Sequence, residues 1–340
     1  MPLAKLQFRP GINRESTSYA NEGGWFDCDK VRFHLGYPEK IGGWQKYSSS
    51  TYLGTARALH NWIALDGSNY MGVGTNFKYY VEEGGGYNDI TPIRTTTSAG
   101  DVTFSATNGS TTLTVSDTSH GADENDFVTF SGAVTLGGLV TAEVLNQEYQ
   151  ITQIVDSNSY EVTLASAANA SDTGNGGASV VGTYQISVGL NTQVGGTGWG
   201  ASTWSRGTWG SAATIGTDAE LRLWSHDNFG EDLLINPRDS AIYYWDKSST
   251  LSSRAVEIGT LGGASDTPTI AKQILVSDND RHVISVGVNA LGSADQDPLL
   301  IRFSDQESLT DWTPTATNTA GDLRLGSGSE FITAIETKRE

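Results

Sequence analysis

Cysteine, long apolar runs and basic residues are all scarce in this chain of 340 residues, and each scarcity excludes a class of protein. Cys28 is the only cysteine, which excludes an internal disulfide and a cysteine-rich metal site and fits assembly in a reducing compartment. We interpret it as a half-buried small apolar side chain. The N-terminal residues MPLAKLQFRPGINRES lack the apolar core of a signal peptide, and no run approaches the roughly 18 apolar residues of a membrane helix. The sequence predicts neither export by that route nor a membrane span.

Basic residues are outnumbered by acidic ones. Lys and Arg number 21, Asp and Glu number 39, and the formal net charge is −18. Because nucleic acids and anionic membranes are bound largely through Lys and Arg, we expect no sequence-specific nucleic-acid binding and no attachment to an anionic membrane.

The sequence also has no pattern that demands catalysis. Its five histidines form neither an H-E-x-x-H motif nor a pair at i and i+4, and they are His34, His60, His120, His226 and His282. No serine lies in a G-x-S-x-G elbow, and no G-x-x-x-x-G-K-[ST] phosphate loop is present. The glycine-rich stretch GGTGWG has no helical pattern after it, which argues against a dinucleotide site. We therefore expect no enzyme activity, no catalytic residue, no cofactor and no metal site.

Glycine, by contrast, is abundant. The 40 glycines, together with many Ser, Thr and Asn residues, are typical of short strands joined by tight turns. Apolar and polar residues alternate repeatedly, and helical periodicity over a dozen residues is hard to find. The composition and the alternation predict an all-β chain.

Three stretches share one order of elements. They begin at ALHNWIAL, LRLWSHDNF and KQILVSDND, and each contains a strand, a polar turn, a second strand and a third strand rich in large residues. The third strands are centred on Tyr79-Tyr80-Val81, Tyr243-Tyr244-Trp245 and Ile301-Arg302-Phe303. Candidate fourth strands follow at DITPI, AVEIG and DLRLG. Four antiparallel strands per repeat predict the blades of a β-propeller, which bury their apolar faces by stacking on one another.

The final residues EFITAIETKRE have the pattern of the first strand of a fourth unit. Propellers usually close with about 4–8 blades. We therefore expect either that this chain is a fragment of a longer polypeptide or that other subunits complete the ring.

The domain organisation follows from where the repeat is interrupted. Residues 1–94 are interpreted as an N-terminal arm and the first blade, and residues 186–340 as a Trp-rich return segment followed by further blades. Residues 95–185 have few Trp and clean hairpin patterns, so we expect a small β-sandwich or barrel inserted into the propeller at a loop.

One hairpin in the inserted region illustrates the pattern. In YQITQIVDSNSYEVTLA, Ile151 and Val155 precede the turn DSNS, and Tyr160, Val162 and Leu164 follow it at every second position. Such alternation predicts that these five side chains lie on the buried face of a half-buried hairpin.

The stretch GWGASTWSRGTWGS, residues 198–211, spaces three tryptophans by five residues. On an extended strand this spacing turns Trp199 and Trp209 to one face and Trp204 to the other, which favours packing between two bodies over a flat sugar platform. Bends at the intervening glycines would bring the three rings to a shared face. Packing is the favoured interpretation, and a ligand platform is the alternative.

Two polar stretches resemble known sites and are interpreted as structural. SDQESLTDWTP lacks the spacing and the glycine of the aspartate box of sialidase-like propellers, so we expect a hairpin capped by Asp305, with Trp312 packed between blades. HGADENDF gathers acidic residues beside His120 but lacks the D-x-D-x-D-G spacing of a calcium loop. Its three acids are expected to be solvated loop residues, and they are Asp123, Glu124 and Asp126.

Positive charge gathers beside aromatic residues in CDKVRFHLGYPEK. Lys30, Arg32 and Lys40 lie there with Phe26, Phe33 and Tyr37. The hypothesis is a contact with an acidic partner subunit, and the alternative is a contact with a blade of the same chain.

A family resemblance is carried by FRPGINRESTSYANEGGWFDCDKVRFHLGYPEKIGGWQKY, residues 8–47. It continues in order through DTSHGADENDFVTFSGA, LNQEYQITQIVDSNSYEVTLASAA, GWGASTWSRGTWG, DLLINPRDSAIYYWD and FSDQESLTDWTPTATNTAGDLRLGSGSEFITAIE. These segments resemble a family of tail proteins of short-tailed bacteriophages, described as packaged-DNA stabilisation, tail-hub or tail-nozzle proteins. The resemblance spans nearly the whole chain, although the family's members extend beyond this C-terminus.

The resemblance implies a structural virion protein below the portal and adaptor, assembled in the host cytoplasm and retained in the virion tail. It also implies propeller-based subunits arranged as a homo-oligomeric ring, often of six, in contact with the adaptor, the portal and other tail proteins. DNA would pass through the central channel without sequence-specific binding, and an acidic wall suits such a conduit because it does not hold phosphates. The alternatives are a carbohydrate-binding tail module that recognises the host surface through Trp199, Trp204 and Trp209, and, much less favoured, a propeller glycosidase.

Overall fold

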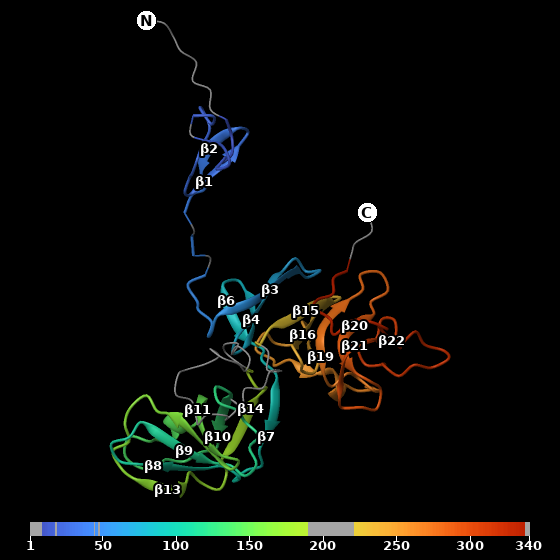
Figure 1. Ribbon diagram of the computed structural model, residues 1–340. Coiled ribbons are helices and arrows are strands. Elements are labelled where there is room, and N and C mark those ends of the chain that lie inside the picture. Colours follow the sequence, from blue (N-terminus) through green and yellow to red (C-terminus); the bar gives the residue numbers. More distant parts are fainter. Residues whose placement is uncertain (1–8, 18, 44, 47, 190–220, 337–340) are drawn as a thin grey trace, which may run out of the picture. The chain divides into compact units, whose positions relative to one another are not determined.

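The computed structural model describes residues 9–17, 19–43, 45–46, 48–189 and 221–336 (Figure 1). The chain divides into two compact units, Met1–Ser49 and Ser50–Glu340. Helical structure in the described residues amounts to one α-helix of four residues, Ala142–Leu145 (α1), and one 3-10 turn, Ile258–Thr260. The predicted all-β fold, with blade-like antiparallel sheets, is confirmed.

The first unit contains a short hairpin formed by strands Val31–His34 (β1) and Tyr37–Lys40 (β2). Leu35 and Gly36 connect them with φ of 49° and 84°, so both turn residues adopt the left-handed conformation that a tight two-residue hairpin turn requires. Glycine accommodates this conformation without a steric cost, which explains its place at the second turn position.

The second unit contains three four-stranded antiparallel sheets, which we call blades 1, 2 and 3 (Figure 1). Blade 1 consists of Ala56–Ile63 (β3), Asn69–Thr75 (β4), Tyr79–Glu83 (β5) and Gly86–Asp89 (β6). Blade 2 consists of Trp224–Phe229 (β15), Asp232–Pro237 (β16), Tyr243–Trp245 (β17) and Val256–Glu257 (β18). Blade 3 consists of Ala271–Val276 (β19), Val283–Asn289 (β20), Gln296–Phe303 (β21) and Gly321–Arg324 (β22).

Aromatic and aliphatic side chains fill the space between consecutive blades. The core between blades 1 and 2 contains Trp62, Tyr79, Trp224 and Trp245, all less than 9% exposed. Blade 1 approaches blade 2 so closely at Gly74 that a Cβ atom there would lie 2.5 Å from Cδ1 of Trp224. The absence of a side chain at Gly74 therefore makes room for the indole of the next blade.

The core between blades 2 and 3 is mainly aliphatic. It brings Leu234 and Ile242 of blade 2 against Ile274 and Val283 of blade 3, with Trp312 buried beside them. The indole N–H of Trp312 donates to the carbonyl of Leu309. This burial agrees with the expectation that Trp312 packs between blades.

A separate eight-stranded sheet lies between blade 1 and blade 2 in the sequence, and we call it the inserted sheet. Its strand order is β13-β8-β9-β12-β11-β10-β14-β7. The strands are Ile93–Thr96 (β7), Thr103–Ala106 (β8), Thr112–Ser116 (β9), Phe127–Ser131 (β10), Glu148–Asp156 (β11), Ser159–Thr163 (β12), Asp172–Asn175 (β13) and Val181–Gln185 (β14).

The inserted sheet curls over its own core. Phe104 of β8 packs edge-on against Phe130 of β10, although three strands separate β8 from β10 in the sheet. The hydroxyl groups of Tyr160 and Tyr184 lie 2.7 Å apart within the same core, and the Tyr184 hydroxyl donates to Asp117. Contacts across the curl give this region its sandwich-like character.

Two details of the expected strands are wrong. The fourth strand of blade 1 is Gly86–Asp89 and ends at the first residue of DITPI, because Gly84 and Gly85 form a tight turn with positive φ and return the chain at once. In the hairpin of β11 and β12, Ile151, Tyr160, Val162 and Leu164 are buried as predicted, but Val155 is 50% exposed. Register shifts along β11 turn Val155 outward and bring Ile154 against the core.

The C-terminal segment also departs from expectation. Residues 331–336 carry no strand assignment within the described part of the chain. They nevertheless run beside β19, where Ala334 N–H donates to Oε1 of Gln273 at 3.0 Å and Asp278 N–H donates to Oε1 of Glu336 at 3.0 Å. Within the described residues, no helix is long and apolar enough to cross a membrane.

Replacing Trp245 by alanine should lower the free energy of unfolding by about 3–5 kcal/mol, because it empties a large site between two blades. Trp245 is 1% exposed and packs against Trp62 and Tyr70. The change is measured by urea denaturation at neutral pH. Leu65→Ala, at a residue 93% exposed, is the control and should shift stability by less than about 0.5 kcal/mol. Equal stability of the two variants would contradict the assigned core.

Candidate functional site

The first strands of the three blades lie side by side and parallel. Between β3 and β15, Nε2 of His60 lies 2.6 Å from Oδ1 of Asn228. Between β15 and β19, Ile274 N–H donates to Oγ of Ser225 at 3.1 Å and Val276 N–H donates to Oδ2 of Asp227 at 2.8 Å. Side chains of one first strand thus bind the backbone or side chains of the next, and residues 331–336 repeat this relation with β19.

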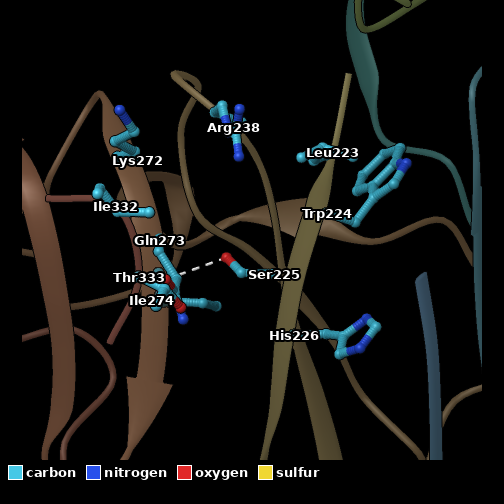
Figure 2. Close-up of a pocket in the computed structure, with 10 residues that line it drawn as sticks. All are labelled: Leu223, Trp224, Ser225, His226, Arg238, Lys272, Gln273, Ile274, Ile332 and Thr333. Atoms are coloured by element: carbon cyan, nitrogen blue, oxygen red, sulfur yellow. Dashed lines mark hydrogen bonds between the residues drawn. The ribbon is translucent and has the colours of Figure 1, made fainter. Parts of the chain in front are cut away.

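A cavity of about 320 Å³ opens beside these first strands (Figure 2). It is lined by β15, by β19, by the loop after β16 and by the C-terminal segment. The lining residues are Leu223, Trp224, Ser225, His226, Arg238, Lys272, Gln273, Ile274, Ile332 and Thr333. Figure 2 shows Ser225 turned toward β19, and Trp224 and His226 on the opposite side of their strand.

Two cationic side chains, Arg238 and Lys272, give the cavity its polar character. The ammonium group of Lys272 lies 2.5 Å from Oε2 of Glu330. The hydrogen bond and the charge of Lys272, with a smaller contribution from Arg238, lower the pKa of Glu330. Lys272, a lining residue of the cavity, is therefore already paired with a carboxylate of its own chain.

The remaining polar groups of the cavity serve the fold. Oγ of Ser225 accepts the Ile274 N–H and lies 3.1 Å from Oδ1 of Asn236, and Gln273 forms both of its amide hydrogen bonds with Ala334. The hydroxyl of Ser225 is held between the Ile274 N–H and Asn236. It is therefore not hydrogen-bonded to a general base, as the hydroxyl of a catalytic nucleophile would be. The cavity geometry supports a structural joint between first strands.

A histidine pair lies at the contact of blades 1 and 2. The rings of His60 and His226 are 4.9 Å apart, and the hydroxyl of Tyr79 lies 2.8 Å from Nδ1 of His226. Burial and the neighbouring His60 lower the pKa of His226 to about 4, although a hydrogen bond with the backbone of Leu59 acts in the opposite direction. His226 is therefore neutral at physiological pH.

A buried ion cluster joins blade 1 to the inserted sheet. Nζ of Lys78, a residue 2% exposed, lies 2.8 Å from Oδ2 of Asp89 and 2.6 Å from Oε1 of Glu148, and it stands 4.7 Å from the ring centroid of Phe127. Arg254 of blade 2 also binds Asp89, at 2.6 Å. Burial acts to raise the pKa of Asp89, but the charges of Lys78 and Arg254 outweigh it and lower the pKa.

Of the residues singled out from the sequence, Trp199, Trp204 and Trp209 lie outside the described residues. Their proposed packing and platform roles stay predictions.

The structure describes all three basic candidates. Arg32 forms an ion pair with Glu39 at 3.2 Å across the hairpin of the first unit. Lys40 pairs in register with Val31 and so points to the opposite face, and Nζ of Lys30 lies 3.9 Å from a carboxylate oxygen of Asp29. All three are exposed, and their contact with an acidic partner subunit or with a blade of the same chain stays a prediction.

The expected solvated loop of Asp123, Glu124 and Asp126 is wrong for one member. Asp123 and Glu124 are exposed, whereas Asp126 is 1% exposed and accepts hydrogen bonds from the N–H groups of Asp123 and Val188. Burial raises the pKa of Asp126, and these hydrogen bonds offset part of the effect. Within the described ranges, no group of three or more His, Cys, Asp or Glu side chains is arranged to hold a metal ion.

Sequence reasoning missed the histidine pair and the Lys78 cluster. The internal repeat contained the signal for the first, because His60 and His226 both lie in the first strand of their units. No comparable signal exists for the second, since Lys78 and Glu148 are brought together only when the inserted sheet meets blade 1.

Lys78→Met should destabilise the protein by roughly 3–5 kcal/mol, because it leaves the carboxylate of Glu148 without its cationic partner. Denaturant unfolding measures the change. Lys247→Met removes the same charge from a pair with Asp66, whose side chain is 51% exposed, and should leave stability nearly unchanged. Equal effects of the two substitutions would show that the cluster does not hold the inserted sheet.

Stability should decline as the pH falls from about 6.5 to about 4. In this window the unfolded chain protonates His226 and the folded chain does not, so unfolding takes up a proton. The lowered pKa of His226 corresponds to roughly 3 kcal/mol of folding free energy. This contribution is fully lost once the pH is below the pKa of His226 in the folded chain. Denaturation at several pH values should show a flatter stability profile for His226→Gln than for the parent chain. Parallel profiles for His226→Gln and the parent would refute the assignment.

Comparison with known proteins does not identify a family for this chain. No family model and no curated protein matches the chain. Among solved structures, a phage phi92 endosialidase aligns with 82% of this chain and 40% of its own, at 13% identity and a TM-score of 0.22. The chain therefore spans well under half of that protein, and a TM-score this low establishes neither a shared fold nor a shared function.

Proposed function

We propose that this chain is a structural subunit of the tail of a short-tailed bacteriophage, part of the hub or nozzle around the DNA exit channel. The observation that carries the proposal is the ordered resemblance to tail-hub and tail-nozzle proteins from residue 8 to the end of the chain. The three repeats found in the sequence coincide with blades 1, 2 and 3.

The distribution of charge supports a conduit role. Residues 95–185, most of the inserted sheet, contain ten Asp and Glu and no Lys or Arg. Asp101, Asp123, Glu124, Glu143 and Asp156 are exposed on it. A surface of this sign repels DNA phosphates and so does not retain a passing genome.

The buried charged side chains also favour a structural role. Where charged side chains are buried, as at Lys78 and Asp126, their partners come from a neighbouring sheet or loop of the same chain. Such contacts fix the relative positions of sheets. In the proposed role, copies of the chain form a homo-oligomeric ring beside the portal and adaptor.

Immunogold electron microscopy on purified virions tests this proposal, with antibody raised against the chain. Label on the short central tail is expected. Label confined to peripheral fibres or spikes would contradict it and would favour the carbohydrate-binding alternative, whose candidate platform is Trp199, Trp204 and Trp209. If the antibody detects the chain in infected-cell lysate but does not label virions, the chain is not a component of the virion.

A further inference from the structure

A second cavity, of about 270 Å³, lies where the connection from β18 to β19 meets blade 3. One wall is that connection, and the other is formed by the turn between β20 and β21 and by β21 itself. Its remaining lining residues are Gly or Ala, but six are polar, namely Asp266, Thr267, Thr269, Asn289, Ser293 and Arg302. A ligand in this cavity is therefore held by charge and hydrogen bonds.

The guanidinium of Arg302 lies on the side of blade 3 that packs against blade 2. Arg302 pairs in register with Ser285, and Ser285 pairs with Ile274, a core residue of the contact between these blades. Its Cζ is also 5.9 Å from the ring centroid of Trp312, which is buried in the same contact. The cavity therefore belongs to the contact between two described blades.

Arg302 carries a buried charge that is not neutralised at close range. It is 2% exposed, and within the described residues its guanidinium forms no ion pair. Nη1 donates to the carbonyl of Asn289 at 3.3 Å, and Nη2 donates to the carbonyls of Asp266 and Trp312. These three bonds leave two of the five guanidinium N–H groups without an acceptor in the described chain.

The environment of Arg302 favours an incoming anion. Burial lowers the pKa of Arg302, and the charges of Asp266 and Asp322 act in the opposite direction without forming an ion pair with it. Lys78, by contrast, is buried with two carboxylates in contact. Because a buried cation without an ion pair is costly, a carboxylate that reaches Arg302 gains a strong, charge-assisted partner.

The two walls are held at a fixed distance by Asn289, which is 4% exposed. Its Oδ1 accepts the N–H groups of Thr269 and Ile270 at 3.0 Å and 3.3 Å, and its Nδ2 donates to the carbonyl of Ser293 at 2.8 Å. The amide of Asn289 thus ties the connection between blades to the turn of blade 3. The cavity is preformed, which lowers the entropic cost of binding.

Hydroxyl groups surround the charged end of the cavity. The hydroxyls of Thr267 and Thr269 have no hydrogen-bond partner in the part of the chain that the structure describes. Oγ of Ser293 accepts the N–H of Asp295 at 3.1 Å, and its hydrogen is still available to donate. Three hydroxyls beside one guanidinium suit a ligand that carries both a carboxylate and hydroxyl groups.

We propose that this cavity binds a small organic monocarboxylate that bears hydroxyl groups. Its carboxylate pairs with Arg302, whose planar fork matches carboxylate geometry, and its hydroxyls bond with Thr267 and Thr269. A phosphate dianion fits less well, since Arg302 is the one cationic residue of the described lining and Asp266 lies beside it. The inference goes beyond the proposed function and does not depend on it, because it concerns the isolated chain.

Isothermal titration calorimetry of the full chain with sodium gluconate, at pH 7 and constant ionic strength, tests the proposal. Gluconate should bind with a dissociation constant of about 1 mM. Acetate supplies only the carboxylate and glucose only the hydroxyls, so each should bind at least about tenfold more weakly. Absence of gluconate binding, or equal binding of glucose, would overturn the proposal, as would tighter binding of inorganic phosphate.

Arg302→Lys keeps the positive charge but removes the planar fork, and it should weaken gluconate binding at least about tenfold. Arg324→Lys is the matched control, because Arg324 pairs with Asp297, has a side chain 58% exposed and does not line the cavity. It should bind gluconate like the parent chain. Parent-like binding by Arg302→Lys would contradict the assigned role of the guanidinium.

Thr267→Val with Thr269→Val provides a second test that leaves Arg302 in place. The two substitutions keep the shape of the side chains and remove their hydroxyls, so gluconate affinity should fall to that of acetate, with acetate binding unchanged. Circular dichroism checks that each variant folds, and the double variant carries the test if Arg302→Lys does not. Unchanged gluconate affinity in the double variant would refute the proposed hydroxyl contacts.

Discussion

The structure depends on the burial of each blade against the next. A four-stranded sheet of this size has two faces and cannot cover either alone, so blades 1, 2 and 3 exist as a series. Trp62, Trp224 and Trp245 fill the first contact, and Leu234, Ile274 and Trp312 fill the second. The parallel first strands, joined by hydrogen bonds such as that from Ile274 N–H to Ser225, fix the angle at which the sheets stack. Everything else in the second unit is placed relative to this stack.

The inserted sheet shows how a second body is attached to such a series. Its own core, with Phe104, Phe130 and Tyr160, is independent of the blades. Lys78 holds it by a charged contact with Glu148, and Arg222 reinforces the return of the chain, since its guanidinium donates to the carbonyl of Ser187. Burial lowers the pKa of Arg222 to about 10, which leaves it charged at neutral pH. Polar anchors at the junction and an apolar core within each body are the pattern expected of an insertion into an existing fold.

Much of the blade architecture could be predicted from the sequence because it rests on local patterns. The third strands at Tyr79–Glu83 and Tyr243–Trp245 carry doublets of large residues that only a buried strand accommodates. The fourth strand of blade 1 was misplaced because the double glycine at 84 and 85 reverses the chain earlier than DITPI suggested. Val155 was misplaced because a register shift is invisible to a period-two count.

The candidate site was less predictable for the same reason. Arg32 forms an ion pair with Glu39 seven residues later, a pairing that the hairpin register alone determines. Asp126 was expected in solvent, yet the return of the chain at Val188 buries it. Contacts between residues far apart in sequence, such as Lys78 with Glu148, form only when separate sheets meet and leave no local signal.

The most direct test of the central claim is a cryo-electron microscopy reconstruction of the phage tail. The account predicts a ring of copies around the axial channel, each containing the stacked blades and the inserted sheet. Density for the blades only in peripheral fibres, or a central tail without this fold, would contradict it.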